Sequence, residues 1–159
     1  MITFQKIRWK NFLSTGDHPS EIDFTKNGTN LIVGTNGTGK STVLDALTFS
    51  LFNKPFRKIN KSQLVNATNE KDTKVEVEFS INGKQYLVRR CMKPNLFEIE
   101  VDGQKMHKQS DDRAMQKILE ENILKVNYKS FTQIVILGSS AFVPFMQLSG
   151  TNRREVIED

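Results

Sequence analysis

The sequence is poor in the residues that build oxidised scaffolds, zinc modules and membrane spans. Cys91 is the single cysteine among 159 residues, so the chain cannot form an internal disulfide or supply a second thiol to a zinc ion. No apolar run approaches roughly 18 residues, and the N-terminus MITFQKIRWK lacks the apolar stretch of a signal peptide. These absences predict a cytoplasmic chain with no membrane partner.

The composition is that of one folded domain. Apolar residues make up 37% of the chain and 11 phenylalanines are present, which is enough to fill a core. A length of 159 residues fits a single domain of roughly 100 to 200 residues. The net charge of +5 suits a polyanionic partner, and the excess lies mainly in residues 54–129.

The first third of the chain predicts two short strands, at residues 2–9 and 21–25, followed by a strand, a glycine loop and a helix. Residues 30–33 (NLIV) form a compact apolar run typical of a buried strand. Residues 41–52 then place apolar side chains at helical spacing.

The remainder predicts an antiparallel sheet and further helices. Residues 73–81, 84–90 and 96–101 alternate apolar and charged side chains and are separated by turns, as expected for strands exposed on one face. An amphipathic helix is predicted after Ser110 as its N-cap, a buried strand at residues 133–137, and a helix from about residue 152 with a cap at Thr151.

Residues 34–41 (GTNGTGKS) match the phosphate-binding P-loop. Its glycines let backbone N–H groups turn toward phosphate oxygens, the following helix directs its positive end at them, and Lys40 adds a charge near the β- and γ-phosphates. Ser41 is placed to bind magnesium through its hydroxyl. Thr42 is placed to bond the α-phosphate.

The P-loop alone does not choose among kinase, GTPase and ATPase. Neither Asn-Lys pair, at residues 53–54 and 60–61, is followed by the Asp of a guanine-binding motif, and no apolar run ends in Asp-Glu, the Walker B pattern. A small nucleotide kinase would need an arginine-rich acceptor region near residues 120–159, where only Arg153 and Arg154 occur. The chain is therefore predicted to bind phosphates without carrying its own hydrolytic carboxylates.

Several segments together resemble one family. They are residues 10–14 (KNFLS), the P-loop with its flanks (NLIVGTNGTGKST) and residues 44–47 (LDAL). All three resemble the N-terminal half of the ATPase head of SMC-like DNA double-strand-break repair ATPases of the SbcC type. Residues 49–57, 133–138 and 144–146 are similar to the T-even phage members of that family.

The resemblance implies an α/β fold, in which residues 1–159 form a single N-terminal lobe of a split ABC-type ATPase head, with a mixed sheet around the P-loop helix and an antiparallel subdomain. The final helix would lead into a coiled coil. ATP and Mg²⁺ would be the cofactors, and magnesium would be bound by Ser41 and by Ser139 in the Q loop. Leu13 stands where many relatives have arginine. The implied nucleotide-binding residues are Ser14, Asn36, Gly37, Thr38, Gly39, Lys40, Ser41 and Thr42.

The resemblance further implies partners: the C-terminal lobe of the same ATPase, a nuclease subunit, a second head in a homodimer, and double-stranded DNA. Hydrolysis would need the C-terminal lobe and dimerisation, and the isolated chain is not expected to turn over ATP. A non-hydrolysing DNA-binding or scaffold module remains the alternative. The basic clusters best suited to a DNA backbone, which could equally be solvated surface, are Lys54, Arg57, Lys58 and Lys61, then Arg89, Arg90 and Lys93.

Overall fold

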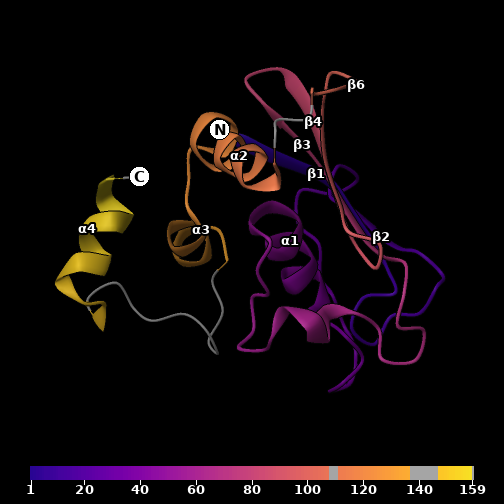
Figure 1. Ribbon diagram of the computed structural model, residues 1–159. Coiled ribbons are helices and arrows are strands. Elements are labelled where there is room, and N and C mark those ends of the chain that lie inside the picture. The colour runs from indigo at the N-terminus through magenta and orange to yellow at the C-terminus, as the bar shows by residue number, and fades with distance from the viewer. Residues whose placement is uncertain (108–110, 137–146, 159) are drawn as a thin grey trace.

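A six-stranded antiparallel sheet dominates the fold of the computed structural model, which describes residues 1–107, 111–136 and 147–158 (Figure 1). The strands lie in the order β2-β1-β3-β4-β5-β6, so the N-terminal strand pairs with both β2 and β3. Their bounds are β1 Ile2–Lys10, β2 Ser20–Asp23, β3 Thr73–Ile81, β4 Lys84–Met92, β5 Leu96–Val101 and β6 Gln104–Lys105.

The helices cover one face of this sheet, with α1 against its middle strands (Figure 1). Phe131 on α3 contacts both Phe52 on α1 and Phe4 on β1, which joins the helices to the sheet in one core. The helices are α1 Thr42–Phe52, the 3-10 turn η1 Lys61–Leu64, α2 Asp112–Lys117, the π-helix η2 Ile118–Leu124, α3 Tyr128–Ile134 and α4 Gly150–Glu158. Among the described residues, no helix is long and apolar enough to cross a membrane.

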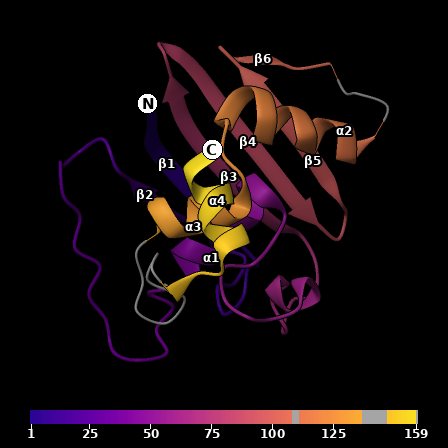
Figure 2. The same ribbon diagram turned by 90° about the vertical axis from the view of Figure 1, so that its left-hand side faces the viewer.

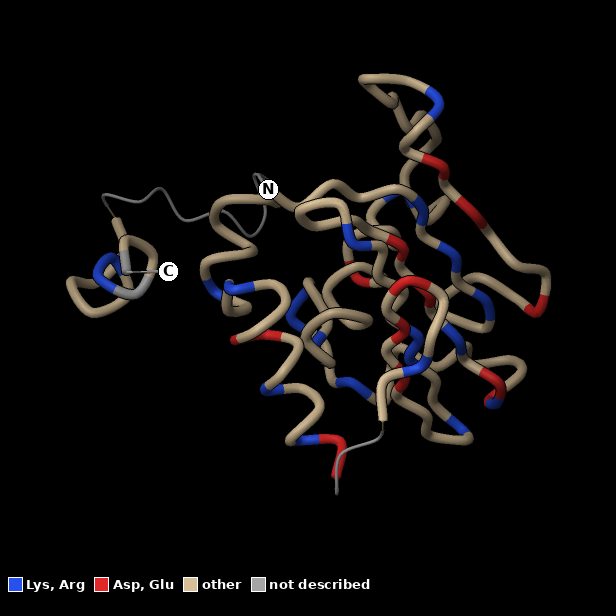
Figure 3. The backbone as a smooth tube through the Cα atoms, turned by 90° about the horizontal axis from the view of Figure 1, so that it is seen from above, with Lys and Arg blue, Asp and Glu red and all other residues tan. Residues whose placement is uncertain are grey.

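The two faces of the sheet follow the alternation in the sequence. Val75, Val77 and Phe79 on β3 are buried toward the helices, while Glu76 and Glu78 lie on the opposite face with charged neighbours from other strands. Figure 3 shows acidic and basic residues interspersed along these strands. The predicted hairpin and the strand at residues 96–101 are confirmed, and the strands predicted at 2–9 and 21–25 belong to this same antiparallel sheet.

The buried strand predicted at residues 30–33 is wrong for this chain. These residues form an irregular segment, and the side chains of Leu31 and Val33 are 87% and 81% exposed. Figure 2 shows the connection between β2 and α1 running out to one side of the sheet. An apolar run forms a buried strand only when neighbouring strands cover it, and none of the six strands of the described sheet pairs with this segment.

The buried strand predicted at 133–137 is also wrong over residues 133–136, because the helix at 128–134 includes the first two and none of the four is in a strand, while residue 137 lies outside the described residues. Asn127 caps this helix by accepting a hydrogen bond from the Ser130 N–H at 3.0 Å, and Phe131 anchors it in the core. The last helix begins at Gly150, and the Ser149 hydroxyl, not Thr151, accepts from the Asn152 N–H. Asp111 caps α2, while the predicted cap Ser110 lies outside the described residues.

Candidate nucleotide site and basic surfaces

The glycine loop folds around the ammonium of Lys40. Gly37 and Gly39 both adopt φ of +88°, a conformation that side-chain-bearing residues rarely take. At Gly34, a Cβ atom would lie 2.5 Å from the Thr38 hydroxyl, so a larger residue would displace the Thr38 side chain. Lys40 Nζ donates to the carbonyl oxygens of Gly34 at 2.5 Å and Thr35 at 2.8 Å, which holds its charge inside the loop.

The first turn of α1 opens into this loop. Ser41 is the N-cap residue of α1, but its side chain makes no capping hydrogen bond, so the hydroxyl points to no partner within the helix. Ser41 is exposed, whereas Thr42 is buried behind it. The dipole of α1 favours an anion at this position.

A second loop forms the opposite wall of the site. Residues 11–15 turn back after β1, and the side-chain amide of Asn66 donates to the carbonyl oxygens of Leu13 at 2.9 Å and Thr15 at 3.2 Å. This clamp brings Ser14 beside the P-loop, where a Cβ atom on Gly39 would lie 3.7 Å from the Ser14 hydroxyl oxygen. Loop residues from distant parts of the chain thereby face each other.

The two walls enclose a pocket of about 500 Å³. Seven of the eight nucleotide-binding residues predicted from the sequence line it, and the eighth, Thr38, instead donates its hydroxyl to the Thr35 carbonyl and lines a neighbouring pocket. The pocket is lined by Leu13, Ser14, Asn36, Gly37, Gly39, Lys40, Ser41, Thr42, Arg57, Gln63, Val65 and Ala67.

Arg57 is a pocket residue that sequence reasoning placed elsewhere. Asp45, which is fully buried on α1, accepts hydrogen bonds from the backbone N–H groups of Phe56 and Arg57 at 3.0 Å and from Arg57 Nε at 2.6 Å. The Tyr128 hydroxyl donates to the Pro55 carbonyl at 2.8 Å and ties down the same segment. The guanidinium is therefore held at the pocket wall, and Asp45 has a structural role.

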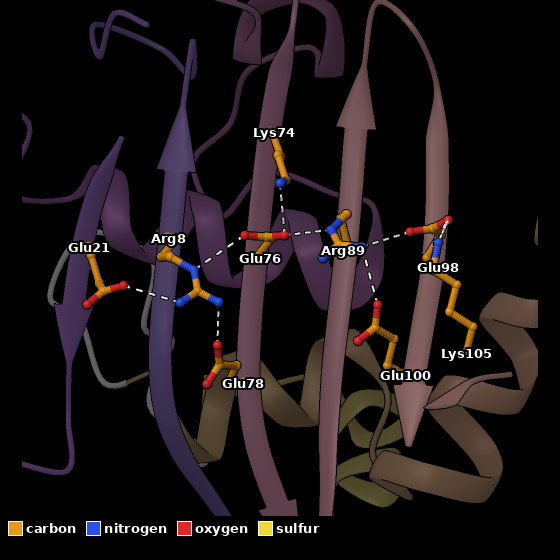
Figure 4. A network of polar contacts seen from close by, with 9 residues as sticks. All are labelled: Arg8, Glu21, Lys74, Glu76, Glu78, Arg89, Glu98, Glu100 and Lys105. Atoms are coloured by element: carbon orange, nitrogen blue, oxygen red, sulfur yellow. Dashed lines mark hydrogen bonds and ion pairs between the residues drawn. The ribbon is translucent and has the colours of Figure 1, made fainter. Parts of the chain in front are cut away.

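Arg89 forms ion pairs with carboxylates on the face of the sheet opposite the helices (Figure 4). Its guanidinium donates to Glu76 at 2.5 Å and to Glu98 at 2.9 Å, and it also pairs with Glu100. Arg8 pairs with carboxylates on both sides of it in the same network. The network shown in Figure 4 contains five carboxylates and four cations, so this face does not concentrate positive charge.

Arg90 lies on the opposite, helix-covered face and is only 4% exposed. Nε donates to the Ser50 carbonyl at 3.1 Å and Nη2 to Gln116 Oε1 at 2.6 Å, and the guanidinium carbon lies 3.7 Å from the centre of the Phe97 ring. A group this buried is not part of an exposed basic surface. The sequence prediction placed Arg90 among exposed surface cations, and its burial contradicts that placement.

The other predicted cations are exposed. Lys54, Lys58, Lys61 and Lys93 lie at the surface of loops and of η1, with Lys54 5.4 Å from the centre of the Tyr128 ring. The predicted magnesium ligand Ser139 lies outside the described residues. Within the described chain, no group of three or more His, Cys, Asp and Glu residues could hold a metal ion.

Residues 6–158 match the family model described as AAA domain. The chain belongs to this AAA domain family. Exonuclease subunit 2 of Escherichia phage RB69 is 44% identical over 154 residues, and that of Enterobacteria phage T4 is 42% identical over the same length. Each alignment covers 97% of this chain and 27% of the phage protein, so the AAA domain spans about a quarter of these relatives.

More distant relatives are named as DNA break-repair proteins and nuclease subunits. A DNA double-strand break repair Rad50 ATPase of Thermoplasma volcanium is 27% identical over 161 residues, covering 98% of this chain and 17% of that protein. A solved structure described as "Structural biochemistry of ATP-driven dimerization and DNA stimulated activation of SMC ATPases" matches with a TM-score of 0.65 at 25% identity, covering 98% of both chains. The AAA domain thus has the fold of the N-terminal lobe of an SMC-type ATPase head, as the sequence resemblance predicted.

Proposed function

We propose that this AAA domain is the ATP- and magnesium-binding lobe of a DNA break-repair or recombination ATPase that acts with a nuclease subunit. The pocket between the P-loop and residues 11–15 carries the proposal, since it combines a held ammonium, an uncapped helix N-terminus and an arginine on its wall. The names of the phage relatives, subunits of an exonuclease, support the nuclease partner.

The proposed nucleotide contacts follow from this geometry. Backbone N–H groups of residues 36–42 and the side chain of Lys40 bind the phosphates, and Ser14 and Arg57 reach them from the other wall. Magnesium prefers oxygen ligands and retains waters, so it needs few protein groups. The Ser41 hydroxyl fits that role because it has no capping bond and faces the pocket, and Ser139 remains a proposed second ligand.

Hydrolysis is assigned to a larger assembly. The described residues place no carboxylate among the pocket-lining side chains, so the water-activating group must come from another segment. We assign it to a C-terminal lobe docked at residues 31–33, whose exposed aliphatic side chains have the pattern of an interior strand. Dimerisation of two heads would then complete the site, and α4 would continue toward a coiled coil.

We place DNA contacts at the exposed lysines Lys54, Lys58, Lys61 and Lys93, while Arg57 is reassigned to the nucleotide pocket. The network around Arg89 balances cations with carboxylates and is excluded from this surface.

Binding of a fluorescent ATP analogue to the Lys40→Ala variant tests the nucleotide site. Loss of a charge-assisted contact of ~1.5 to 3 kcal/mol predicts a dissociation constant about 10- to 150-fold higher. Lys26→Ala, which removes an exposed lysine that does not line the pocket, should bind like the wild type. Equal affinity of Lys40→Ala and wild type would refute the assignment.

The scaffold alternative is distinguished by turnover. The C-terminal lobe is added in trans together with double-stranded DNA, and phosphate release is measured over a range of stoichiometries. The proposal predicts DNA-stimulated hydrolysis that Lys40→Ala abolishes. An absence of turnover at every ratio, with nucleotide still bound, would favour a non-hydrolysing module.

A further inference from the structure

A second pocket, of about 270 Å³, lies between the C-terminal end of α1, strands β4 and β5, and helix α2. It is separate from the nucleotide pocket and shares no lining residue with it. Three of its side chains are cationic and Asp112 is its acidic one. The lining residues are Asn53, Lys61, Arg90, Cys91, Asn95, Leu96, Phe97, Asp112, Arg113 and Gln116.

Arg90 forms the buried base of this pocket. The groups that contact its guanidinium are neutral: the Ser50 carbonyl, the Gln116 side-chain oxygen and the Phe97 ring. Burial lowers the pKa of Arg90 to about 10, and the charges of Asp112 and Glu120 offset the burial only in part. Arg90 thus stays protonated at neutral pH, and within the described residues no carboxylate forms an ion pair with its guanidinium.

One edge of the guanidinium remains available to a ligand. Nε and Nη2 donate to the protein, whereas Nη1 donates to no group in the described part of the chain. Arg90 lines the pocket, and the two N–H groups of Nη1 are guanidinium donors that no described group accepts.

Two further cations line this pocket. Lys61 lies on η1, with its ammonium 5.9 Å from the centre of the Phe49 ring, and Arg113 lies on α2, and both residues are exposed. Burial, followed by the positive charge of Arg90, lowers the pKa of Lys61, and the negative charge of Asp112 opposes this shift. An anion between Lys61 and Arg90 would relieve their repulsion and supply the ion pair that Arg90 lacks.

We propose that this pocket binds a phosphoryl group, with Arg90 Nη1 at its base and Lys61 and Arg113 at its rim. A tetrahedral oxyanion accepts several hydrogen bonds at once, and arginine presents donors in a geometry suited to it. Two sources have this chemistry: a backbone phosphate of DNA, or a free phosphate or phosphate ester. The DNA source rests on the proposed function, because Lys61 is one of the lysines proposed there to contact DNA. Binding of a free phosphate or phosphate ester does not rest on that proposal.

The test follows inorganic phosphate binding residue by residue, using backbone amide chemical shifts of the full chain carrying Lys40→Ala to weaken the P-loop. Saturable shifts are expected at residues 90–97 and 112–116. The double variant Lys61→Ala/Arg113→Ala should weaken this binding about tenfold or more. The matched control Lys84→Ala/Lys125→Ala removes two exposed lysines beside a cavity at another end of the sheet and should leave the affinity unchanged.

A short DNA duplex is then titrated into the same variants. If the duplex shifts the amides of residues 90–97 and 112–116 as phosphate does, and Lys61→Ala/Arg113→Ala removes both sets of shifts, the phosphoryl group is that of DNA. If the duplex leaves these amides unshifted while phosphate shifts them, the pocket takes a free phosphate or phosphate ester, and the proposal holds without DNA. Shifts confined to residues 36–42, or an affinity for phosphate that neither variant changes, would overturn it. The variants replace only exposed residues at the rim. The test therefore leaves the buried Arg90 in place and needs no substitution in the core.

Discussion

Asp45 Oδ2 lies 2.6 Å from Arg57 Nε, so a fully buried carboxylate on the P-loop helix positions an arginine on the wall of the nucleotide pocket. The same carboxylate accepts hydrogen bonds from the backbone N–H groups of Phe56 and Arg57. The helix that presents its N-terminus to the phosphates therefore also fixes the segment opposite. The P-loop helix and the segment that carries Arg57 are therefore held together by these hydrogen bonds.

Arg57→Ala is expected to weaken ATP binding without unfolding the domain. The side chain of Arg57 is 42% exposed, so its loss costs little core packing, but a charge-assisted contact with phosphate contributes ~1.5 to 3 kcal/mol. Affinity for a fluorescent ATP analogue should fall about tenfold or more. The urea midpoint should also fall, because the fully buried Asp45 keeps two backbone donors but loses its cation, so affinity is measured in the absence of urea, where the domain is folded. Lys58→Ala, which removes the adjacent exposed cation, serves as the control. If Arg57→Ala bound the nucleotide as tightly as the wild type, the assignment of Arg57 to the nucleotide pocket would be wrong.

Asp45→Ala should instead destabilise the fold. Two part-buried backbone N–H groups and the partly exposed guanidinium of Arg57 lose their shared acceptor, and each backbone donor left unsatisfied costs about 1 to 3 kcal/mol. Part of this cost is recovered where the segment relaxes toward water, so we expect a decrease of about 2 to 4 kcal/mol in the free energy of unfolding. Urea denaturation measures it. A loss below about 0.5 kcal/mol would show that the segment is held by other contacts.

The strands of the sheet could be predicted because their residues alternate in the sequence. Each β-strand residue points to the face opposite that of its neighbour, so the pattern of Val75, Glu76, Val77 and Glu78 determines both the strand and its buried side. The P-loop was predictable for a different reason, since phosphate binding requires glycines and a lysine at fixed spacing.

The same alternation shows why the basic pair at residues 89–90 was misinterpreted. Two adjacent arginines form one cluster in the sequence, but on β4 they lie on opposite faces, Arg89 among carboxylates and Arg90 beneath α2. Applying the strand period to the charges, as it was applied to the apolar residues, would have separated them. Arg57 could not have been assigned in this way, because its position depends on a tertiary contact with Asp45.

The segments at 30–33 and 133–137 illustrate a limit of apolar runs as a signal. Short apolar runs are common to buried strands and buried helices, and length and neighbours must decide between them. For residues 128–134 the deciding feature was local, the Asn127 cap four residues before Phe131. For residues 30–33 no local feature could reveal that the described sheet supplies no neighbouring strand.

The network around Glu76 should make the stability of the fold depend on pH in the acid range. Burial raises the pKa of Glu76, but hydrogen bonds from Arg89 and Lys74 outweigh it and hold the pKa below its ordinary value. The pKa of Glu98 is lowered as well, mainly by its hydrogen bond from Lys105. A carboxylate whose folded pKa lies below its unfolded value of about 4.3 stabilises the fold above that pH, and the contribution is lost as the pH falls through the folded pKa.

Urea unfolding at several pH values between about 6 and 3 measures this dependence. Glu76→Gln should be less stable than the wild type at pH 6, because it cannot form the ion pairs with Arg8, Lys74 and Arg89. The difference should narrow as the pH falls, since protonation removes the same ion pairs from the wild type. If the difference in free energy of unfolding between the wild type and Glu76→Gln stayed constant from pH 6 to pH 3, Glu76 would act through packing and not through its charge.

The salt dependence of DNA binding separates the exposed lysines from the arginines of the sheet. Each phosphate contact contributes about 0.9 to the slope of log K against log salt concentration, so Lys58→Ala and Lys93→Ala should each reduce the slope by about that amount. Arg89→Gln should leave the slope unchanged, because its charge is already neutralised by Glu76, Glu98 and Glu100. Duplex affinities measured between about 50 and 200 mM salt provide the slopes. If Arg89→Gln reduced the slope as much as Lys93→Ala did, DNA would lie across the sheet, and the carboxylates there would have to separate from Arg89 to admit it.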